Sequence, residues 1–545
     1  MSIGGLPAIR EAVLKTVFEA VRAGDMSRAR RAAIDGLARG VEHAFLLNLR
    51  ALDFEDVGRF SDALKDLRRA HVLAPKDFTI LNACGLCLAR MDRFEEAVRC
   101  YDQALEIKPE FGQAWFNRGW ALERLGETVK AEQSFVRAVE IHPENVEAWA
   151  RLAWLAARRG DGAEVLRHAG RALALQPGHP TAMLAMSDVA VTAPAEAERR
   201  LRDLLSSSLS TFERAMALGL LADALDAQGK PANAFAAYVA SNKLFREDAS
   251  DRFEGPGAES VRHALGWLNS WAETLDRVSW ADTAPSAVSD GGERRHVFLI
   301  GFPRSGTTLI ETILGAHPDV AALEERNTLD AAARAFLTKR SDLERLASAS
   351  ARDLDPMRAD YWDRVKRAGV DPAGRIFIDK NPFNTSKLPV IHRLFPAALV
   401  IFAVRDPRDV ALSCFRRRFT LNPSTYELLD LDRTAAVYDL TMRLAETLRE
   451  RFDLREFRLV YEDLVADPPK AARAVCEFIG ATWRDEMLEI ADRGRSGSVA
   501  SASSAQIARG LYADGVGQWR RFRGQLEPVL PTLAPWVKRF GYPAD

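Results

Sequence analysis

The chain has few cysteines, almost no net charge and no long apolar run, and each of these features excludes a class of protein. Its 545 residues contain 5 cysteines, an odd number too small for a disulfide framework, so we expect free thiols in a reducing compartment. The net charge of −1 leaves no excess of positive charge for general binding to nucleic acid or to a membrane surface.

Membrane and metal functions find no support in the sequence either. No apolar run approaches the roughly 18 residues of a membrane span, and the N-terminal MSIGGLPAIREAVLK has no apolar signal core, which predicts a cytoplasmic protein. Cys84 and Cys87 form a lone CxxC pair. Neither a second pair nor a nearby histidine completes a site, so packing within a helix is the favoured interpretation and we expect no bound metal.

The first half of the chain repeats with a period of 34 residues. Small and aromatic residues share the period, and it is marked most clearly by four prolines, Pro75, Pro109, Pro143 and Pro177. Small residues allow helices to approach closely, and a proline prevents the second helix of a unit from continuing. Gly85 and Gly119 are one period apart, as are Tyr101 and Phe135, and we interpret these aromatic residues as repeat packing.

This 34-residue unit resembles the tetratricopeptide repeat. The resemblance implies an N-terminal α-solenoid over residues 1–250, with the clearest repeats in 42–177. Residues 251–294 are predicted to be a helix and a linker, and residues 295–545 a second domain. Such an array commonly binds peptides or proteins on its concave surface, so we expect a protein or peptide partner, or self-association as a homo-oligomer. The alternative is an array that only buttresses the second domain.

The second domain opens with an apolar run, Val297 to Ile300, which leads into a turn and then into a helical pattern. A strand, a turn and a helix in this order can bind an anion, because free N–H groups and the positive end of the helix dipole face the turn. Gly301 and Gly306 have the spacing of a nucleotide P-loop. Position 307 is threonine instead of the P-loop lysine, and Arg304 is the cation within the turn.

The string PRSGTTL in this turn resembles the 5′-phosphosulfate loop of sulfotransferases that use 3′-phosphoadenosine 5′-phosphosulfate (PAPS), nearest the tyrosylprotein branch. The resemblance implies a P-loop-like, doubly wound α/β domain with a central parallel sheet and PAPS as the sulfuryl donor. It also implies a catalytic role for Arg304. A degenerate P-loop is the alternative interpretation of the turn alone. The implied cofactor contacts in the loop are Pro303, Arg304, Ser305, Gly306, Thr307 and Thr308.

Two further motifs supply the implied catalytic groups. The string HPDV leads to Glu324 and Glu325, and in the family the second of such a pair removes the proton of the acceptor hydroxyl, which assigns that role to Glu325. Glu324 takes the role if the register moves by one residue, and a solvated acidic pair is the non-functional interpretation. The string DKNPF follows another predicted strand, and the resemblance places Lys380 at the transferring sulfuryl group.

The remaining implied cofactor contacts lie downstream. Arg405 follows the predicted strand Ala398 to Val404, and Ser413 lies eight residues later, as in the family element that holds the 3′-phosphate. An extended positive rim is one interpretation of Arg408 and of the arginines 416–418, and solvated helix positions or acceptor contacts are the favoured one. Tyr461, in a YEDL string that ends another predicted strand, is implied at the adenine. A cofactor-covering loop after residue 494 is implied to contribute Ser503, Ser504 and Arg509, the last in place of an expected lysine.

Together the motifs predict a transferase, a PAPS-dependent sulfotransferase that acts on an acceptor hydroxyl, and the resemblance favours a protein or peptide tyrosine. A glycan or a small metabolite stays open as acceptor, because fold does not determine substrate. A nucleotide kinase or ATPase would require the lysine that the loop lacks. A third hypothesis is a non-catalytic scaffold with a degenerate nucleotide-binding domain, which the joint retention of the motif residues opposes.

Overall fold

The computed structural model describes residues 6–258, 260–275, 295–452, 454–488 and 515–545. The chain divides into two compact units, Met1–Val189 and Ala190–Asp545. Among the described residues, no helix is both long and apolar enough to cross a membrane.

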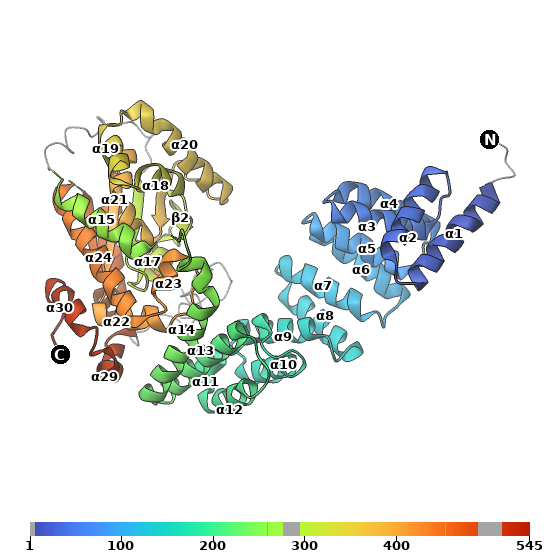
Figure 1. Ribbon diagram of the computed structural model, residues 1–545, viewed down its shortest axis with the longest axis horizontal. Coiled ribbons are helices and arrows are strands. Elements are labelled where there is room, and N and C mark those ends of the chain that lie inside the picture. Colours follow the sequence, from blue (N-terminus) through green and yellow to red (C-terminus); the bar gives the residue numbers. More distant parts are fainter. Residues whose placement is uncertain (1–5, 259, 276–294, 453, 489–514) are drawn as a thin grey trace. The chain divides into compact units, whose positions relative to one another are not determined.

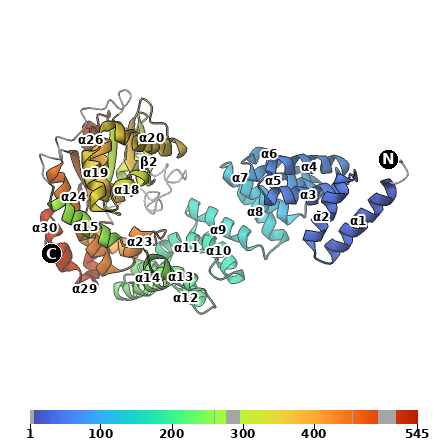
Figure 2. The same cartoon turned by 45° about the horizontal axis from the view of Figure 1, so that its top comes forward.

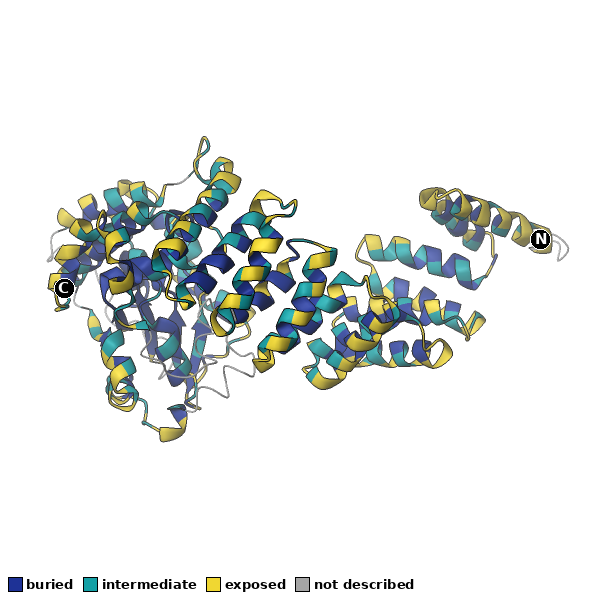
Figure 3. Ribbon diagram, turned by 90° about the horizontal axis from the view of Figure 1, so that it is seen from below, coloured by how far each residue is buried: buried dark blue, intermediate teal, exposed yellow. Residues whose placement is uncertain are grey.

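The first unit is built from successive pairs of helices (Figures 1 and 2). Each helix buries one side against its neighbours and exposes the other, as the alternation of dark blue and yellow in Figure 3 shows. The helices are α1 (Leu6–Arg22), α2 (Met26–Ala38), α3 (Ala44–Asp56), α4 (Phe60–Leu73), α5 (Phe78–Arg90), α6 (Phe94–Ile107), α7 (Gly112–Arg124), α8 (Thr128–Ile141), α9 (Val146–Arg159) and α10 (Gly162–Leu175), followed by α11 (Pro180–Thr192), which ends beyond the unit.

The sequence period reflects contacts that recur in successive pairs. A Cβ atom at Gly85 would lie 2.4 Å from the ring of Tyr101, and one at Gly119 would lie 2.7 Å from the ring of Phe135. Both rings are fully buried. In these two pairs a glycine on the first helix therefore makes room for an aromatic ring on the second, and the predicted α-solenoid of tetratricopeptide type is confirmed.

The second unit begins with helices that pack against the sheet domain. The Nδ2 atom of Asn242 donates to the carbonyl oxygen of Phe415 at 2.8 Å, and that of Asn269 donates to the carbonyl oxygen of Leu440 at 2.9 Å. Contacts therefore group these helices with the sheet, while the segment limits expected from composition remain predictions. The helices are α12 (Pro194–Leu205), α13 (Thr211–Ala227), α14 (Pro231–Phe253) and α15 (Val261–Glu273).

A parallel sheet of five strands forms the core of this unit, in the order β2-β3-β1-β4-β5. In its register Val297 lies opposite Ile378 on one side and Leu399 on the other. Apolar β-branched and aromatic residues dominate the three central strands, as expected for strands covered on both faces. The strands are β1 (His296–Gly301), β2 (Val320–Glu324), β3 (Ile376–Lys380), β4 (Leu399–Val404) and β5 (Arg455–Val460).

Helices cover both faces of the sheet, so the predicted doubly wound α/β fold is confirmed. On one face, α17 (Thr307–Leu314) and α26 (Pro468–Ile479) share an apolar core with Leu299 and Ile401. On the other face, Tyr361 of α20 (Ala351–Arg367) packs against Phe298. The remaining elements include α18 (Asp330–Phe336), α19 (Arg340–Ser348), η1 (Pro382–Lys387), α21 (Leu388–Leu394), α22 (Pro407–Arg416), α23 (Pro423–Glu427), α24 (Leu431–Arg451), α25 (Tyr461–Ala466), η2 (Asp485–Leu488), η4 (Gln518–Phe522), α29 (Arg523–Leu526) and α30 (Leu530–Arg539).

One predicted strand is shorter than expected. The YEDL string does not end a strand, because β5 stops at Val460 and Tyr461 starts helix α25. The departure from the sheet lets the carboxylate of Glu462 accept hydrogen bonds from Asp406 N at 3.1 Å and from the hydroxyl of Tyr542 at 2.6 Å. All five strands are parallel, so residues at their carboxyl ends gather at one edge of the sheet.

Candidate active site

The turn between β1 and α17 depends on its two glycines. Gly301 has a φ of 151°, and a Cβ atom there would lie 2.5 Å from the carbonyl oxygen of Ala403. Gly306 has a φ of 92°, and a Cβ atom there would lie 2.6 Å from the ring of Tyr461. The hydroxyl of Thr385 fixes the start of the turn, since it accepts from Gly301 N at 3.0 Å and donates to Gly301 O at 2.6 Å. A side chain at either position would therefore clash with these neighbours, so the turn requires glycine at both.

Arg304 joins this turn to the end of β4 and to α22. Its Nε atom donates to the Ser413 hydroxyl at 3.0 Å, and its backbone oxygen accepts from Nη1 of Arg405 at 2.9 Å. The guanidinium of Arg405 lies 4.6 Å from the centre of the Tyr461 ring. The loop, the predicted 3′-phosphate element and the predicted adenine contact thus form one site.

The electrostatics of this site favour an anionic ligand. Burial, together with the charges of Arg417 and Arg405, lowers the pKa of Arg304 to about 9. The Nε atom of Arg405 is buried and has no hydrogen-bond partner in the structure. Converging guanidinium groups with an unsatisfied buried donor fit the phosphate and sulfate groups of PAPS, because such oxygens accept charge-assisted hydrogen bonds from arginine.

Lys380 lies at the end of β3, on the face of the sheet covered by α17. Its side chain is fully buried, and its Nζ atom lies 2.9 Å from Glu325, 3.1 Å from Glu311 and 3.4 Å from Glu324. Burial alone would lower the pKa of Lys380, but the charges of Glu311, Glu325 and Glu324 raise it. The lysine is therefore held as an ammonium group within a cluster of three carboxylates.

Glu325 follows β2 in a left-handed backbone conformation, with a φ of 42°. Its N–H donates to the carbonyl oxygen of Lys380 at 2.7 Å, so backbone and side chain both hold it beside the lysine. Among the described residues, only Asp92 and Arg304 besides Glu325 combine a positive φ with a side chain. Two of these three strained positions therefore belong to the predicted site.

A buried hydrogen-bond network supports the segment that carries Glu325. The Asp379 carboxylate accepts from the hydroxyl of Thr328 at 2.7 Å and from that of Tyr361 at 2.9 Å. The Tyr361 hydroxyl also lies 2.7 Å from Nε2 of His296. Burial raises the pKa of Asp379 to about 6, although both hydroxyl donors oppose the shift. The network ties the chain after Glu325 to the strand that ends in Lys380.

Residues 296–485 match the model of the sulfotransferase family, and residues 85–145 match a tetratricopeptide repeat model. Residues 296–485 are therefore a sulfotransferase domain. An uncharacterized protein of Aquifex aeolicus is 30% identical over 46% of this chain and 34% of its own length. Protein-tyrosine sulfotransferase A of Caenorhabditis elegans is 26% identical over 47% of this chain and 70% of its own. Protein-tyrosine sulfotransferase 2 of Gallus gallus is 28% identical over 45% and 69%. The chain thus spans about a third of the length of the Aquifex protein.

Most predicted site residues of the sulfotransferase domain lie at the carboxyl edge of the sheet. Ser305, Thr307 and Thr308 are buried where the turn enters α17. The carbonyl oxygen of Pro303 accepts from the Cys414 thiol, next to Ser413. Ser503, Ser504 and Arg509 lie outside the described residues. The roles assigned to all of these residues remain predictions.

The sequence interpretation of the sulfotransferase domain missed Glu311. Glu311 is a charged residue within the apolar pattern of the buried helix α17, and this exception to the pattern was the signal that could have identified it. Arg417 contributes positive charge to the Arg304 site, in line with the positive-rim interpretation of its cluster. Its neighbours were wrongly taken as solvated or acceptor-facing: the side chain of Arg416 pairs with Asp226 at 2.7 Å, and that of Arg418 pairs with Asp223 at 2.6 Å, both on α13.

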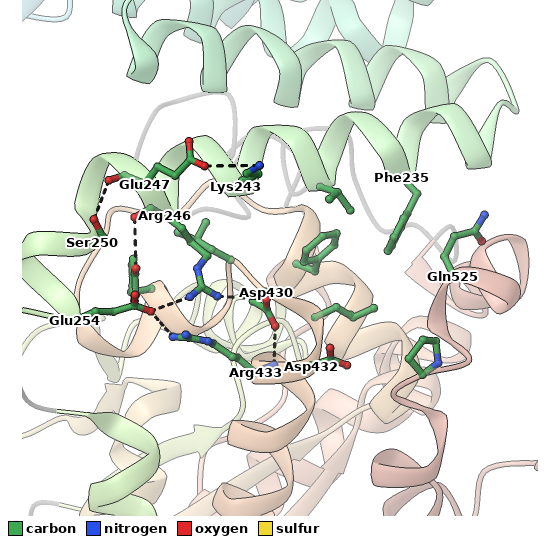
Figure 4. Close-up of a pocket in the computed structure, with 16 residues that line it drawn as sticks. Phe235, Lys243, Arg246, Glu247, Ser250, Glu254, Asp430, Asp432, Arg433 and Gln525 are labelled. Carbon is green, nitrogen blue, oxygen red and sulfur yellow. Dashed lines mark hydrogen bonds and ion pairs between the residues drawn. The ribbon is translucent and has the colours of Figure 1, made fainter.

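A separate cavity of about 730 Å³ lies between α14 and the start of α24 (Figure 4). Its arginines are neutralised by carboxylates: Glu254 lies 2.8 Å from Arg246 and 2.7 Å from Arg433, and Asp430 lies 3.2 Å from Arg246. Phe235 and other apolar side chains line the opposite end. None of the predicted site residues lines this cavity, so it is distinct from the site at the sheet edge.

Proposed function

We propose that the sulfotransferase domain transfers a sulfuryl group from PAPS to the hydroxyl group of a tyrosine in a protein or peptide. The observation that carries the proposal is the contact of Arg304 with both Ser413 and Arg405, which joins the phosphosulfate loop to the predicted 3′-phosphate element. Two anion-binding elements in direct contact suit a donor that carries phosphate groups on both the 3′ and the 5′ positions of one nucleoside. The names of the nematode and chicken relatives support tyrosine as the acceptor.

In this proposal PAPS supplies the activated sulfuryl group, and the bond from sulfur to the bridging phosphate oxygen breaks as the acceptor oxygen bonds to sulfur. Glu325 accepts the hydroxyl proton, since its side chain is half-exposed and within reach of an acceptor. Lys380 donates hydrogen bonds to oxygens that gain charge during transfer. Arg304 and the N-terminus of α17 hold the 5′-phosphosulfate, while Arg405 and Ser413 hold the 3′-phosphate.

The repeat unit is proposed to recruit the acceptor or a partner protein. An extended helical surface suits a macromolecular acceptor better than a small metabolite, which needs only a pocket. Free thiols at all five cysteines suit a reducing compartment and support the proposed cytoplasmic location.

The proposal is tested by transfer and by ligand binding. Labelled PAPS is incubated with the protein and a soluble extract, and mass spectrometry locates the label on tyrosine, glycan or small molecule. We also expect the product 3′-phosphoadenosine 5′-phosphate to raise the melting temperature, since ligand at 100 times its Kd stabilises the folded protein by about 2.7 kcal/mol. Arg405→Ala should abolish this shift. Equal stabilisation by ATP with magnesium, in the absence of transfer, would favour a nucleotide kinase instead.

A further inference from the structure

Glu311 is a buried carboxyl group that the proposed reaction does not use. It lies one turn into α17, just after the phosphosulfate loop, and its Oε2 atom is 3.1 Å from Nζ of Lys380. Three charged residues face its carboxyl group: Lys380 of β3, and Glu324 and Glu325 at the end of β2. A carboxyl group in an otherwise apolar helix face is costly to bury without such a partner.

The Lys380 ammonium group has as many neighbouring carboxylates as it has N–H donors. An ammonium group donates three hydrogen bonds, and three carboxylate oxygens lie 2.9 to 3.4 Å from Nζ. If Lys380 is to donate to a sulfuryl oxygen, one of these contacts must be released. The exposure of the carboxylates decides which one can be released at the smallest cost.

The three glutamates differ in their access to water. Their side chains are 10% exposed for Glu311, 24% for Glu324 and 48% for Glu325. Water can replace the lysine at Glu325, whereas Glu311 would be left as a buried, unpaired charge. Burial raises the pKa of Glu311 to about 7, and the Lys380 charge opposes this shift. The contact with Lys380 therefore favours the ionised form of Glu311, which predominates above about pH 7, and Glu311 is the contact that stays.

We propose that Glu311 is a positioning residue that anchors Lys380 while the lysine exchanges its contact with Glu325 for the sulfuryl group. The exchange makes lysine and base available together, since the Glu325 oxygen released by Lys380 becomes free to accept the acceptor proton. Donor binding would thereby precede deprotonation of the acceptor. This inference rests on the proposed function, because it assigns Lys380 and Glu325 their roles in sulfuryl transfer.

The test compares Glu311→Gln with wild type in the full chain, and first without donor. Gln keeps the shape of the side chain but removes its charge, so the pKa of Lys380, followed by NMR of ¹³Cε-labelled lysine and assigned with Lys380→Met, should fall. Thr312→Val is the matched control, because it removes a hydrogen bond to Thr308 on the same helix without contacting Lys380. It should leave the Lys380 pKa unchanged.

Kinetics supply the second readout. At pH 8 we expect Glu311→Gln to lower kcat about 10-fold with KM for PAPS within about twofold, the pattern of misplaced reacting groups. The difference should shrink at pH 6, where Glu311 of the wild type is mostly protonated and resembles Gln. Glu311→Asp keeps the charge with a shorter reach and should recover part of the loss. It replaces Glu311→Gln in the test if the latter does not fold.

Two failures are distinguishable. An active wild type with an unshifted Lys380 pKa and an unchanged pH profile in Glu311→Gln would overturn the anchoring role alone. A wild type that transfers no sulfuryl group to any acceptor and does not bind 3′-phosphoadenosine 5′-phosphate would overturn the proposed function, and with it the role of Glu311 in transfer.

Discussion

The two units of this protein place their charged residues in opposite ways. In the repeat unit, ion pairs such as Arg159 with Glu132 lie at the surface, and most buried positions are apolar. In the sheet unit, a fully buried lysine lies among three carboxylates, and guanidinium groups of Arg304 and Arg405 converge at the turn after β1. Surface pairs contribute little to stability, whereas buried charges are costly unless they are paired.

The difference distinguishes residues retained for folding from residues retained for a reaction. The repeat unit can be explained by packing alone, since each glycine and aromatic pair recurs with the sequence period. Packing alone does not explain the site. The backbone is strained at Arg304 and Glu325, and neighbouring arginines repel one another, and both features lower stability without improving the core. Such features are expected where a ligand supplies the missing interactions.

The largest expected effect is the loss of the buried lysine. Lys380→Met leaves the buried Glu311 without its partner, so we expect the unfolding free energy of the sheet unit to fall by about 3 to 5 kcal/mol and turnover to be lost. Arg159→Met breaks an exposed pair in the repeat unit and should lower stability by at most about 1 kcal/mol. Denaturant unfolding, with the transition of each unit followed separately, measures both. Equal losses would remove the distinction between the units.

Glycines with positive φ sharpen the same comparison. Gly301→Ala places a Cβ atom against the Ala403 carbonyl oxygen, and this oxygen is held in place because it belongs to the backbone of β4. We therefore expect the unfolding free energy to fall by on the order of 3 kcal/mol. Gly126 also has a positive φ, but open space surrounds it in a repeat turn. Gly126→Ala should therefore show only the backbone penalty, about 1 kcal/mol. Melting temperatures of the two variants provide the measurement, and a harmless Gly301→Ala would contradict the described loop geometry.

The two acidic residues with positive φ should differ in function. Glu325→Gln should lower kcat about 100-fold, the scale of general-base loss, while binding of 3′-phosphoadenosine 5′-phosphate persists. Asp92→Asn, in the turn after α5, should leave both unchanged. Arg405→Ala should instead weaken nucleotide binding. Steady-state kinetics and calorimetry separate these defects, and near-normal turnover in Glu325→Gln would direct attention to Glu324 as the base.

The smallest effect concerns the repeat unit as a whole. A chain that starts at Ala190 keeps α13, α14 and α15, which contact the sheet domain, so it should fold and bind 3′-phosphoadenosine 5′-phosphate. If the repeats recruit the acceptor, KM for the natural acceptor should rise about 10-fold with little change in kcat. Loss of nucleotide binding in this shorter chain would instead favour a buttressing role. An unchanged KM would exclude recruitment.

A chain that starts at residue 280 provides the matched comparison. It lacks Asp223 and Asp226, which pair with Arg418 and Arg416, and it lacks Asn242. Those arginines would lose partly buried partners, so we expect this chain to be much less soluble than the one that starts at Ala190. Equal yield and melting temperature for the two chains would show that the helices before residue 280 do not stabilise the sheet domain.

The sequence by itself determined the features that depend on neighbouring residues. The 34-residue period, the apolar run Val297 to Ile300, the glycines of the turn and the order of the motifs are local patterns, and the structure has helices, strands and turns where these patterns placed them. The parallel sheet was implied by the resemblance of the motifs to the sulfotransferase family, and the structure has it. The prediction that a strand continues through Tyr461 was wrong, because Glu462 finds hydrogen-bond partners on distant segments.

Only the tertiary structure decided which charges meet. Glu311, Glu324 and Lys380 come from a helix and two strands that become neighbours through the order β2-β3-β1-β4-β5, which no local pattern encodes. The same holds for Arg417 near Arg304 and for α13, whose carboxylates neutralise Arg416 and Arg418. Periodicity specifies which face of an element is buried, but the energy of a buried charge depends on what lies opposite it, and the packing of distant segments decides that.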